Sequence, residues 1–176
     1  MKTKKYTIND GMYKTSGKND ECYTPRYVVQ SILRFIPKDV KTIWCPFDKE
    51  ESNFVKVLTE NGYDVIMSHI DDGKDFYSYE PERDYDIIIS NPPFTNKKGI
   101  FERVLSFGKP FMLLMTAQWL NDAAPIDLHF KYGWDIQLIH FRNRVKYLNC
   151  GDKIPFKSLF FCGNVDGMNG NEYINI

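Results

Sequence analysis

The sequence of 176 residues is long enough for one domain with a sizeable hydrophobic core. Its apolar fraction of 43% and charged fraction of 26% are those of an ordinary globular protein, and no stretch approaches the ~20 apolar residues of a membrane span. The 23 basic and 23 acidic residues give a formal net charge of zero. A generally basic surface is thereby excluded, so any affinity for nucleic acid must come from a local patch or from a partner chain.

Both ends of the chain are polar. Residues 1–21 predict a flexible arm and residues 164–176 a polar tail, which leaves residues 22–163 as the folded domain. The amino terminus is basic, but no apolar run follows it, so it does not predict a secretory signal. A cytoplasmic location is therefore expected.

The cysteines predict free thiols rather than a metal site. They are widely scattered, without a Cys-x-x-Cys pair, and the three histidines do not stand at ligand spacing to them. The four residues are Cys22, Cys45, Cys150 and Cys162.

The first predicted element is a helix that ends before Pro37. Thr24 is suited to the N-cap and Pro25 to the first helical position. Apolar residues then recur with the spacing of one helix face up to Ile36.

A strand over residues 40–45 and a helix from residue 54 follow, joined by a turn without glycine. The turn reads Pro46-Phe47-Asp48-Lys49-Glu50-Glu51-Ser52. Its acids suit the N-terminus of a helix, but they would repel a dinucleotide pyrophosphate, which argues against a nicotinamide enzyme.

Residues 62–70 predict a second strand that ends at His69, with Asp71 and Asp72 just beyond. The polar loop that follows contains Asp75 and Phe76.

The next strand ends in the most informative stretch, Asn91-Pro92-Pro93-Phe94. Three consecutive isoleucines at 87–89 predict a strand buried on both faces, and the prolines force the backbone out of the sheet. The carboxyl end of such a strand is where ligands bind in α/β sheets. The Asn91 amide oxygen and the Pro92 carbonyl can accept the two hydrogens of an exocyclic amine, and Phe94 can stack on the ring that carries it.

The rest of the chain continues the alternation of helices and strands. We expect a helix from residue 100 to about residue 107, a buried strand over 111–115, and strands over 135–141 and 153–162. This pattern predicts a parallel α/β sheet with helices on both faces.

The corner at Asn91–Phe94 resembles the Asn-Pro-Pro-Phe signature of the S-adenosylmethionine-dependent adenine-N6 DNA methyltransferases, in particular a subgroup of small phage-type proteins. The resemblance covers roughly residues 22–163. It implies a Rossmann-like class I methyltransferase fold, with a mixed seven-strand sheet and a C-terminal antiparallel hairpin around residues 136–141 and 159–162. The family's turn after the first strand normally contains glycines, and this chain departs from that pattern.

The resemblance also implies roles for individual residues. Asn91, Pro92, Pro93 and Phe94 would form the catalytic corner. In the family, the segment like Tyr23–Thr24 lies over the cofactor's methionine moiety, the residue at His69 is on the ribose side, and the Asp75–Phe76 pair contacts the adenine. The implied S-adenosyl-L-methionine site as a whole comprises Tyr23, Thr24, Cys45, Pro46, Phe47, Asp48, His69, Asp75 and Phe76.

Four cations are candidates for contacts with nucleic acid phosphates: Lys97, Arg142, Arg144 and Lys146. The preferred alternative for Lys97 is a solvated helix start, and the other three also fit the protection of an edge strand. No metal is expected.

Several alternatives remain at this stage. The substrate amine can belong to adenine in DNA, to adenine in RNA or to a protein glutamine, whose methyltransferases use a related Asn-Pro-Pro-aromatic turn. In another class, the glycine-free turn and the neutral charge fit a non-catalytic binding subunit. A separate specificity subunit or a homo-oligomer is a further possible partner.

Overall fold

The computed structural model describes residues 23–148 and 156–176. The predicted arm, Cys22, Cys150 and the start of the predicted last strand lie outside the described residues. The strands are β1 (Thr42–Cys45), β2 (Asp64–Met67), β3 (Ile87–Ser90), β4 (Phe111–Thr116), β5 (Gln137–Phe141), β6 (Ser158–Gly163) and β7 (Asn171–Ile174). The α-helices are α1 (Arg26–Ile32), α2 (Asn53–Glu60), α3 (Lys97–Ser106) and α4 (Ala124–Tyr132), and short 3₁₀ helices span Leu33–Phe35, Ile70–Asp72 and Ala117–Asn121. No helix in the described part of the chain has the length and apolar character needed to cross a membrane.

The strands form one seven-stranded sheet in the order β2-β1-β3-β4-β6-β5-β7. β1, β2, β3 and β4 pair in parallel, and β6 is antiparallel to both of its neighbours, β4 and β5. β7 is parallel to β5. Every strand except β6 therefore runs in the same direction, so their carboxyl ends meet at one edge of the sheet.

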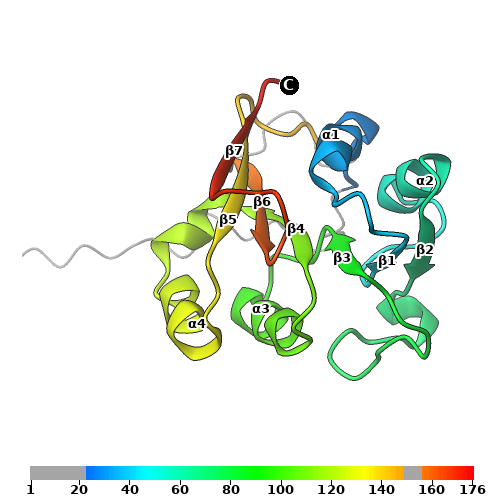
Figure 1. Ribbon diagram of the computed structural model, residues 1–176, viewed down its shortest axis with the longest axis horizontal. Coiled ribbons are helices and arrows are strands. Elements are labelled where there is room, and N and C mark those ends of the chain that lie inside the picture. Colours follow the sequence, from blue (N-terminus) through cyan, green and yellow to red (C-terminus); the bar gives the residue numbers. More distant parts are fainter. Residues whose placement is uncertain (1–22, 149–155) are drawn as a thin grey trace, which may run out of the picture.

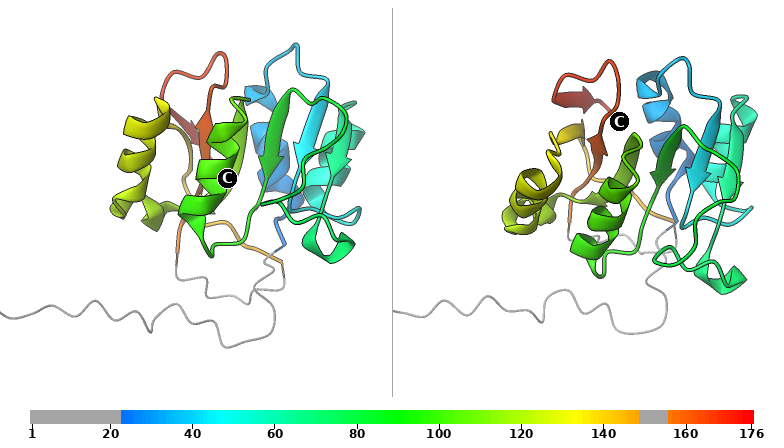
Figure 2. Two further views of the ribbon diagram at one scale, coloured as in Figure 1. Left: turned by 90° about the horizontal axis from the view of Figure 1, so that it is seen from below. Right: turned by 60° about the horizontal axis from the view of Figure 1, so that its bottom comes forward.

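Helices cover both faces of the sheet: α1 and α2 lie on one face, and α3 and α4 on the other (Figures 1 and 2). The strands alternate between two apolar clusters, as the two-residue period of a strand requires. In β3, Ile87 and Ile89 belong to the cluster under α1 and α2, and Ile88 to the cluster under α3 and α4. All four residues of β3 are buried, which confirms the strand predicted from its three isoleucines.

The connection between β2 and β3 contains no additional strand in this fully described stretch. In the classical doubly wound order a further strand would lie outside β2. Here residues 68–86 form a 3₁₀ helix and loops instead, and β2 is the edge strand with only partly buried side chains.

The predicted start of the first helix was wrong by one position. Pro25, not Thr24, is the N-cap of α1, and its carbonyl accepts from the Val28 amide at 3.1 Å. Proline is tolerated there because the N-cap amide has no helical partner to lose. The Thr24 hydroxyl is therefore not used for capping.

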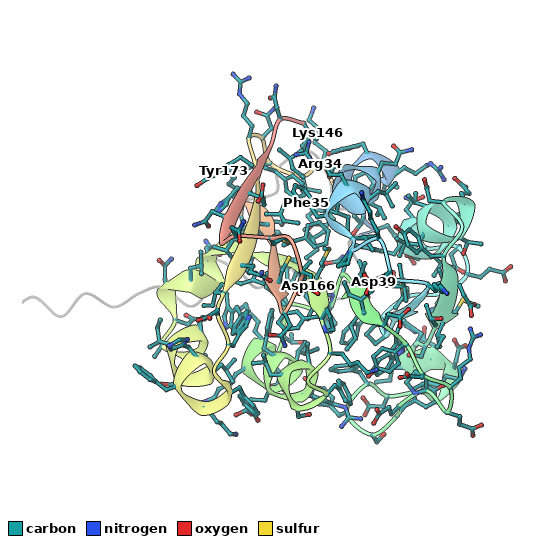
Figure 3. The ribbon with its side chains drawn as sticks, in the orientation of Figure 1. Arg34, Phe35, Asp39, Lys146, Asp166 and Tyr173 are labelled. Carbon is teal, nitrogen blue, oxygen red and sulfur yellow. The ribbon has the colours of Figure 1, made fainter. Side chains whose placement is uncertain are left out.

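The predicted C-terminal tail was also wrong, whereas the predicted hairpin is confirmed. β5 and β6 pair antiparallel, with Leu138 opposite Phe161. Residues 164–176, however, turn back, and β7 adds an edge strand beside β5. Tyr173 stacks on His140 at 5.1 Å between ring centroids, which fixes this strand at the border of the sheet (Figure 3). The four residues of β7 have mixed polarity and do not show the pattern of a strand. The strand is stabilised by its cross-strand partners, which the local sequence does not reveal.

Candidate active site

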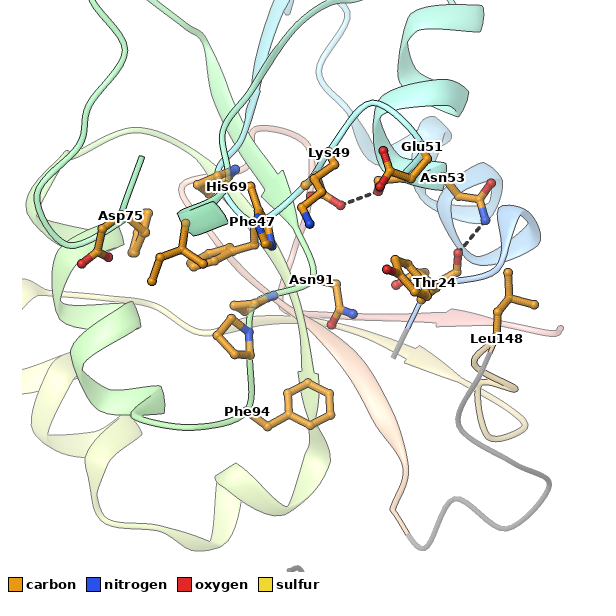
Figure 4. A pocket seen from close by; sticks show the side chains of 18 of the residues that line it. Thr24, Phe47, Lys49, Glu51, Asn53, His69, Asp75, Asn91, Phe94 and Leu148 are labelled. Atoms are coloured by element: carbon orange, nitrogen blue, oxygen red, sulfur yellow. Dashed lines mark hydrogen bonds between the residues drawn. The ribbon is translucent and has the colours of Figure 1, made fainter. Parts of the chain in front are cut away.

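The carboxyl ends of β1, β2 and β3 open into a cavity of about 490 Å³, a size suited to a cofactor or a drug-sized ligand (Figure 4). The cavity joins the corner after β3 to the ends of the first two strands. Asp75 lies at one end of the view, Thr24 and Leu148 at the other, and Asn91 between them. The lining residues are Tyr23, Thr24, Pro46, Phe47, Asp48, Lys49, Glu51, Ser52, Asn53, His69, Ile70, Asp75, Phe76, Tyr77, Asn91, Pro92, Pro93, Phe94 and Leu148.

The structure brings together the four predicted catalytic residues and all of the predicted cofactor residues except Cys45. Cys45 is completely buried in the apolar cluster under α1 and α2, and this burial raises the pKa of its thiol. It is the last residue of β1, and its side chain points to the face of the sheet rather than to the edge. Cys45 therefore does not line the cavity with the other predicted cofactor residues.

Asp48 is the only carboxylate among the described lining residues that is buried, with 7% of its surface exposed. Ser52, the N-cap of α2, donates its hydroxyl to Asp48 Oδ1 and accepts the Phe54 amide at 3.1 Å. Ser90, the last residue of β3, donates to Asp48 Oδ2. Burial raises the pKa of Asp48 to about 6, and the two hydroxyls oppose this rise.

His69 lies two residues beyond the end of β2, and its side chain is 13% exposed. Its Nδ1 accepts the Asp71 amide at 3.1 Å, so the neutral ring carries its proton on Nε2. Asp71 forms an exposed ion pair with Lys49 and does not line the cavity. Of the acceptors predicted near this strand end, the structure therefore places His69 at the site.

The Asp75–Phe76 pair lies at the cavity, but the Phe76 ring packs mainly against other side chains of the core. Asp75 Oδ1 accepts the Tyr77 amide at 3.0 Å, which fixes the loop. Only 3% of Phe76 is exposed, and its ring contacts Trp44 at 5.7 Å and Phe47 at 4.6 Å between centroids. The half-buried ring of Phe47 is thus better placed than Phe76 to present an aromatic face to a ligand.

The corner after β3 is held from two sides. Phe94 packs edge-on against Phe156, with centroids 5.2 Å apart and an interplanar angle of 84°. Beyond it, the Asn96 amide donates to the Tyr77 hydroxyl at 2.9 Å, which ties the corner to the Asp75 loop. Pro92 is buried, Asn91 and Phe94 are half-buried, and Pro93 is exposed.

The far wall of the cavity comes from distant parts of the chain. The Leu148 amide donates to the Tyr23 carbonyl at 2.9 Å, and the Asn53 amide group donates to the Thr24 carbonyl at 2.8 Å. The Thr24 residue is 6% exposed, and its hydroxyl has no hydrogen-bond partner among the described residues. A buried hydroxyl that lines a cavity without a partner is a natural contact for a ligand.

Sequence reasoning did not assign Leu148, Tyr77, Ser52 or Asn53 to the site. Ser52 carried a usable signal, because a serine before an apolar helical run predicts an N-cap. Leu148 carried none, since only its bridge to Tyr23 brings it to the cavity.

The candidate phosphate contacts lie on two segments. Arg142, Arg144 and Lys146 are exposed on the segment that leaves the carboxyl end of β5, at the same edge of the sheet as the cavity. Arg142 donates to the Asn175 side chain at 3.3 Å. Lys97 is half-buried at the start of α3, shortly after the Asn91–Phe94 corner.

No family model and no curated protein matches the sequence. Among solved structures, the chain is similar to a candidate class I S-adenosylmethionine-dependent methyltransferase from Listeria monocytogenes, with a TM-score of 0.60 at 11% identity over 93% of this chain and 68% of that chain. The chain has the class I methyltransferase fold. It is also similar to the modification subunit of a candidate type I restriction enzyme from Vibrio vulnificus, with a TM-score of 0.48 at 13% identity over 92% of this chain and 48% of that chain.

The class I methyltransferase fold predicted from the sequence is thus confirmed, with its mixed seven-strand sheet and helices on both faces. At 11% identity the likeness concerns the fold alone. The chemistry of the site depends on the side chains that line the cavity.

Proposed function

We propose that the protein transfers a methyl group from S-adenosyl-L-methionine to the N6 amine of adenine in nucleic acid, with DNA as the substrate. One observation carries the proposal: a single cavity joins the Asn91–Phe94 corner to the carboxyl ends of β1 and β2. A methyl donor and an amine acceptor must meet in one enclosed space, and this cavity has room for both reactive ends.

The lining residues suit the cofactor along the length of the cavity. Phe47 and Asp75 offer a ring and a carboxylate for an adenine, and His69 lines the cavity where the ribose is expected. At the other end Asp48 offers a carboxylate and Thr24 an unpartnered hydroxyl to an amino acid group. When bound, S-adenosyl-L-methionine supplies an electrophilic methyl group on a sulfonium. The acidic residues of the turn after β1 would repel a pyrophosphate, but they are compatible with the positive charge of the sulfonium.

The Asn91–Phe94 corner would hold the target base. The Asn91 amide oxygen and the Pro92 carbonyl accept the two amine hydrogens, which aims the nitrogen lone pair at the methyl donor. Phe94, supported by Phe156, stacks on the base. Because these groups lie at a cavity, the adenine must leave the helical stack to reach them. The proton of the methylated amine then leaves to water.

Contacts to the nucleic acid backbone would come from a narrow patch, since the chain as a whole is neutral. Arg142, Arg144 and Lys146 are exposed at the same edge of the sheet as the cavity, and Lys97 follows the corner. Phosphate contacts of this kind position a substrate without reading its sequence. A specificity subunit or a second copy of the chain would have to supply sequence readout.

The test is transfer of a tritiated methyl group to duplex DNA, to RNA and to a glutamine peptide. We expect incorporation into adenine of DNA, and its loss in Asn91→Ala with the circular dichroism spectrum unchanged. Transfer at near wild-type rate by Asn91→Ala would refute the mechanism, and transfer only to RNA or to the peptide would replace the substrate.

A non-catalytic subunit is the second candidate, favoured by the turn without glycine between β1 and α2. Calorimetric titration of the wild-type protein with S-adenosyl-L-methionine separates the two. Absence of binding would favour the non-catalytic subunit.

A further inference from the structure

We infer that Asp48 is the residue that selects a positively charged cofactor, by placing its carboxylate against the ammonium or sulfonium group at the Thr24 end of the cavity. The inference rests on the proposed function and deepens it. It also gives the glycine-free turn a specific role. A charged side chain would recognise the cofactor there, in place of the close contact between backbone and cofactor that glycines allow.

The Asp48 carboxylate is built into the wall of the cavity. It follows the carboxyl end of β1, and its oxygens accept hydroxyls from the start of α2 and the end of β3, the two elements that flank it. Each oxygen has two lone-pair directions, so each keeps capacity for one more donor. Its main-chain amide donates to the Ser68 carbonyl at 3.2 Å, which fixes the backbone of the turn.

Asp48 has no cationic partner within residues 23–148 and 156–176. Its hydrogen bonds come from neutral hydroxyls, and the ion pairs of the described residues do not include it. The neighbouring Lys49 pairs with Asp71 at 2.5 Å. Buried carboxylates in proteins are normally paired with a positive charge. A cationic ligand would supply that charge.

Thr24 provides an independent observation at the same end of the cavity. Its hydroxyl is buried and has no hydrogen-bond partner among the described residues. Asn53 holds the Thr24 carbonyl and directly follows Ser52, which binds Asp48. The first turn of α2 thus holds both groups. A hydroxyl donor next to a carboxylate acceptor suits an α-amino acid, which carries one group of each kind.

A purely structural role does not account for the charge at this position. Ser52, not Asp48, caps α2. A neutral asparagine has the same shape, and the serine hydroxyls can rotate to accept from its amide. The carboxylate therefore adds only its charge, and Asp48 lines the cavity.

The experiment compares three ligands by calorimetry with the full-length chain. S-adenosylmethionine carries an ammonium and a sulfonium, S-adenosylhomocysteine only the ammonium, and methylthioadenosine neither. We expect Asp48→Asn to weaken S-adenosylmethionine binding by about 10- to 100-fold, the effect of one charge-assisted hydrogen bond, and to leave methylthioadenosine binding unchanged. S-adenosylhomocysteine then identifies the cation: a similar loss assigns the ammonium, and no loss assigns the sulfonium.

Asp39→Asn is the matched control, because Asp39 is exposed and precedes β1, whereas the cavity lies at the carboxyl end of that strand. Unchanged methylthioadenosine binding also shows that the variant cavity is folded. If Asp48→Asn does not fold, Asp48→Ser makes the same comparison. The inference is overturned if S-adenosylmethionine binding is unchanged, or if methylthioadenosine binding weakens equally. Failure of the wild-type protein to bind S-adenosylmethionine would instead remove the proposed function.

Discussion

Replacement of Asp48 by asparagine should stabilise the folded protein at neutral pH. Burial raises the pKa of this carboxyl from 3.8 to about 6, so the folded state holds its proton more tightly than the unfolded state. The stability that this group contributes is fully present below pH 3.8 and is lost as the pH rises through 6. The difference of about 2 pKa units corresponds to about 3 kcal/mol at pH 7.5, which an uncharged asparagine would recover.

Thermal unfolding followed by circular dichroism measures this effect. For a chain of this size, about 3 kcal/mol corresponds to a rise in Tm of roughly 6–12 °C at pH 7.5. The gap between variant and wild type should close as the pH falls toward 4, where both side chains are neutral. Asp166→Asn, at an exposed position after β6, should give no such gap. A Tm of Asp48→Asn at or below that of the wild type at pH 7.5 would contradict the assignment of Asp48 as a buried, unpaired carboxylate.

Three further predictions follow from the structure. The affinity for S-adenosylmethionine, measured by calorimetry, should rise between pH 5 and 7 as Asp48 ionises. Asp48→Asn should show no such rise, although it keeps the other charged or titratable lining groups, Lys49, Glu51, His69 and Asp75. Gly163→Ala should destabilise the fold by about 1–3 kcal/mol in urea unfolding, because the new Cβ would lie 2.6 Å from the Phe111 ring and 2.8 Å from Trp134 Nε1. Replacing Arg142, Arg144 and Lys146 by glutamine should reduce the salt slope of duplex DNA binding by about 0.9 for each phosphate that is no longer neutralised, and an unchanged slope would place the DNA elsewhere.

The fold could be predicted because its central strands are short contiguous runs of apolar residues, which indicate burial on both faces. The three isoleucines of β3 need no distant partner to identify them, and the helix–strand alternation around them defines the sheet. β7 could not be predicted in this way. Its strand conformation depends on pairing with β5 and on the Tyr173–His140 stack, neither of which is a local property.

In the site, too, the parts set by local sequence could be predicted, and the parts set by distant contacts could not. Asn91–Phe94 is one contiguous motif at a strand end, so its place at the cavity follows from sequence order. Cys45 lies in the core and not at the cavity because strand register, and not proximity to the turn, decides which way a side chain points. Leu148 was missed because only its bridge to Tyr23 brings it to the wall.

Asp48 was recognisable from the sequence, but its role could be interpreted only from the structure. Its residue type was visible in the sequence as an acid in a turn where the family has glycines, and the simplest explanation was helix capping. The structure assigns the cap to Ser52 and directs both that hydroxyl and the Ser90 hydroxyl to Asp48. Asp48 does not cap a helix, has no cationic partner among the described residues and has its pKa raised to about 6 by burial, so the fold itself gives it no reason to be charged. The cavity that it lines supplies a functional one.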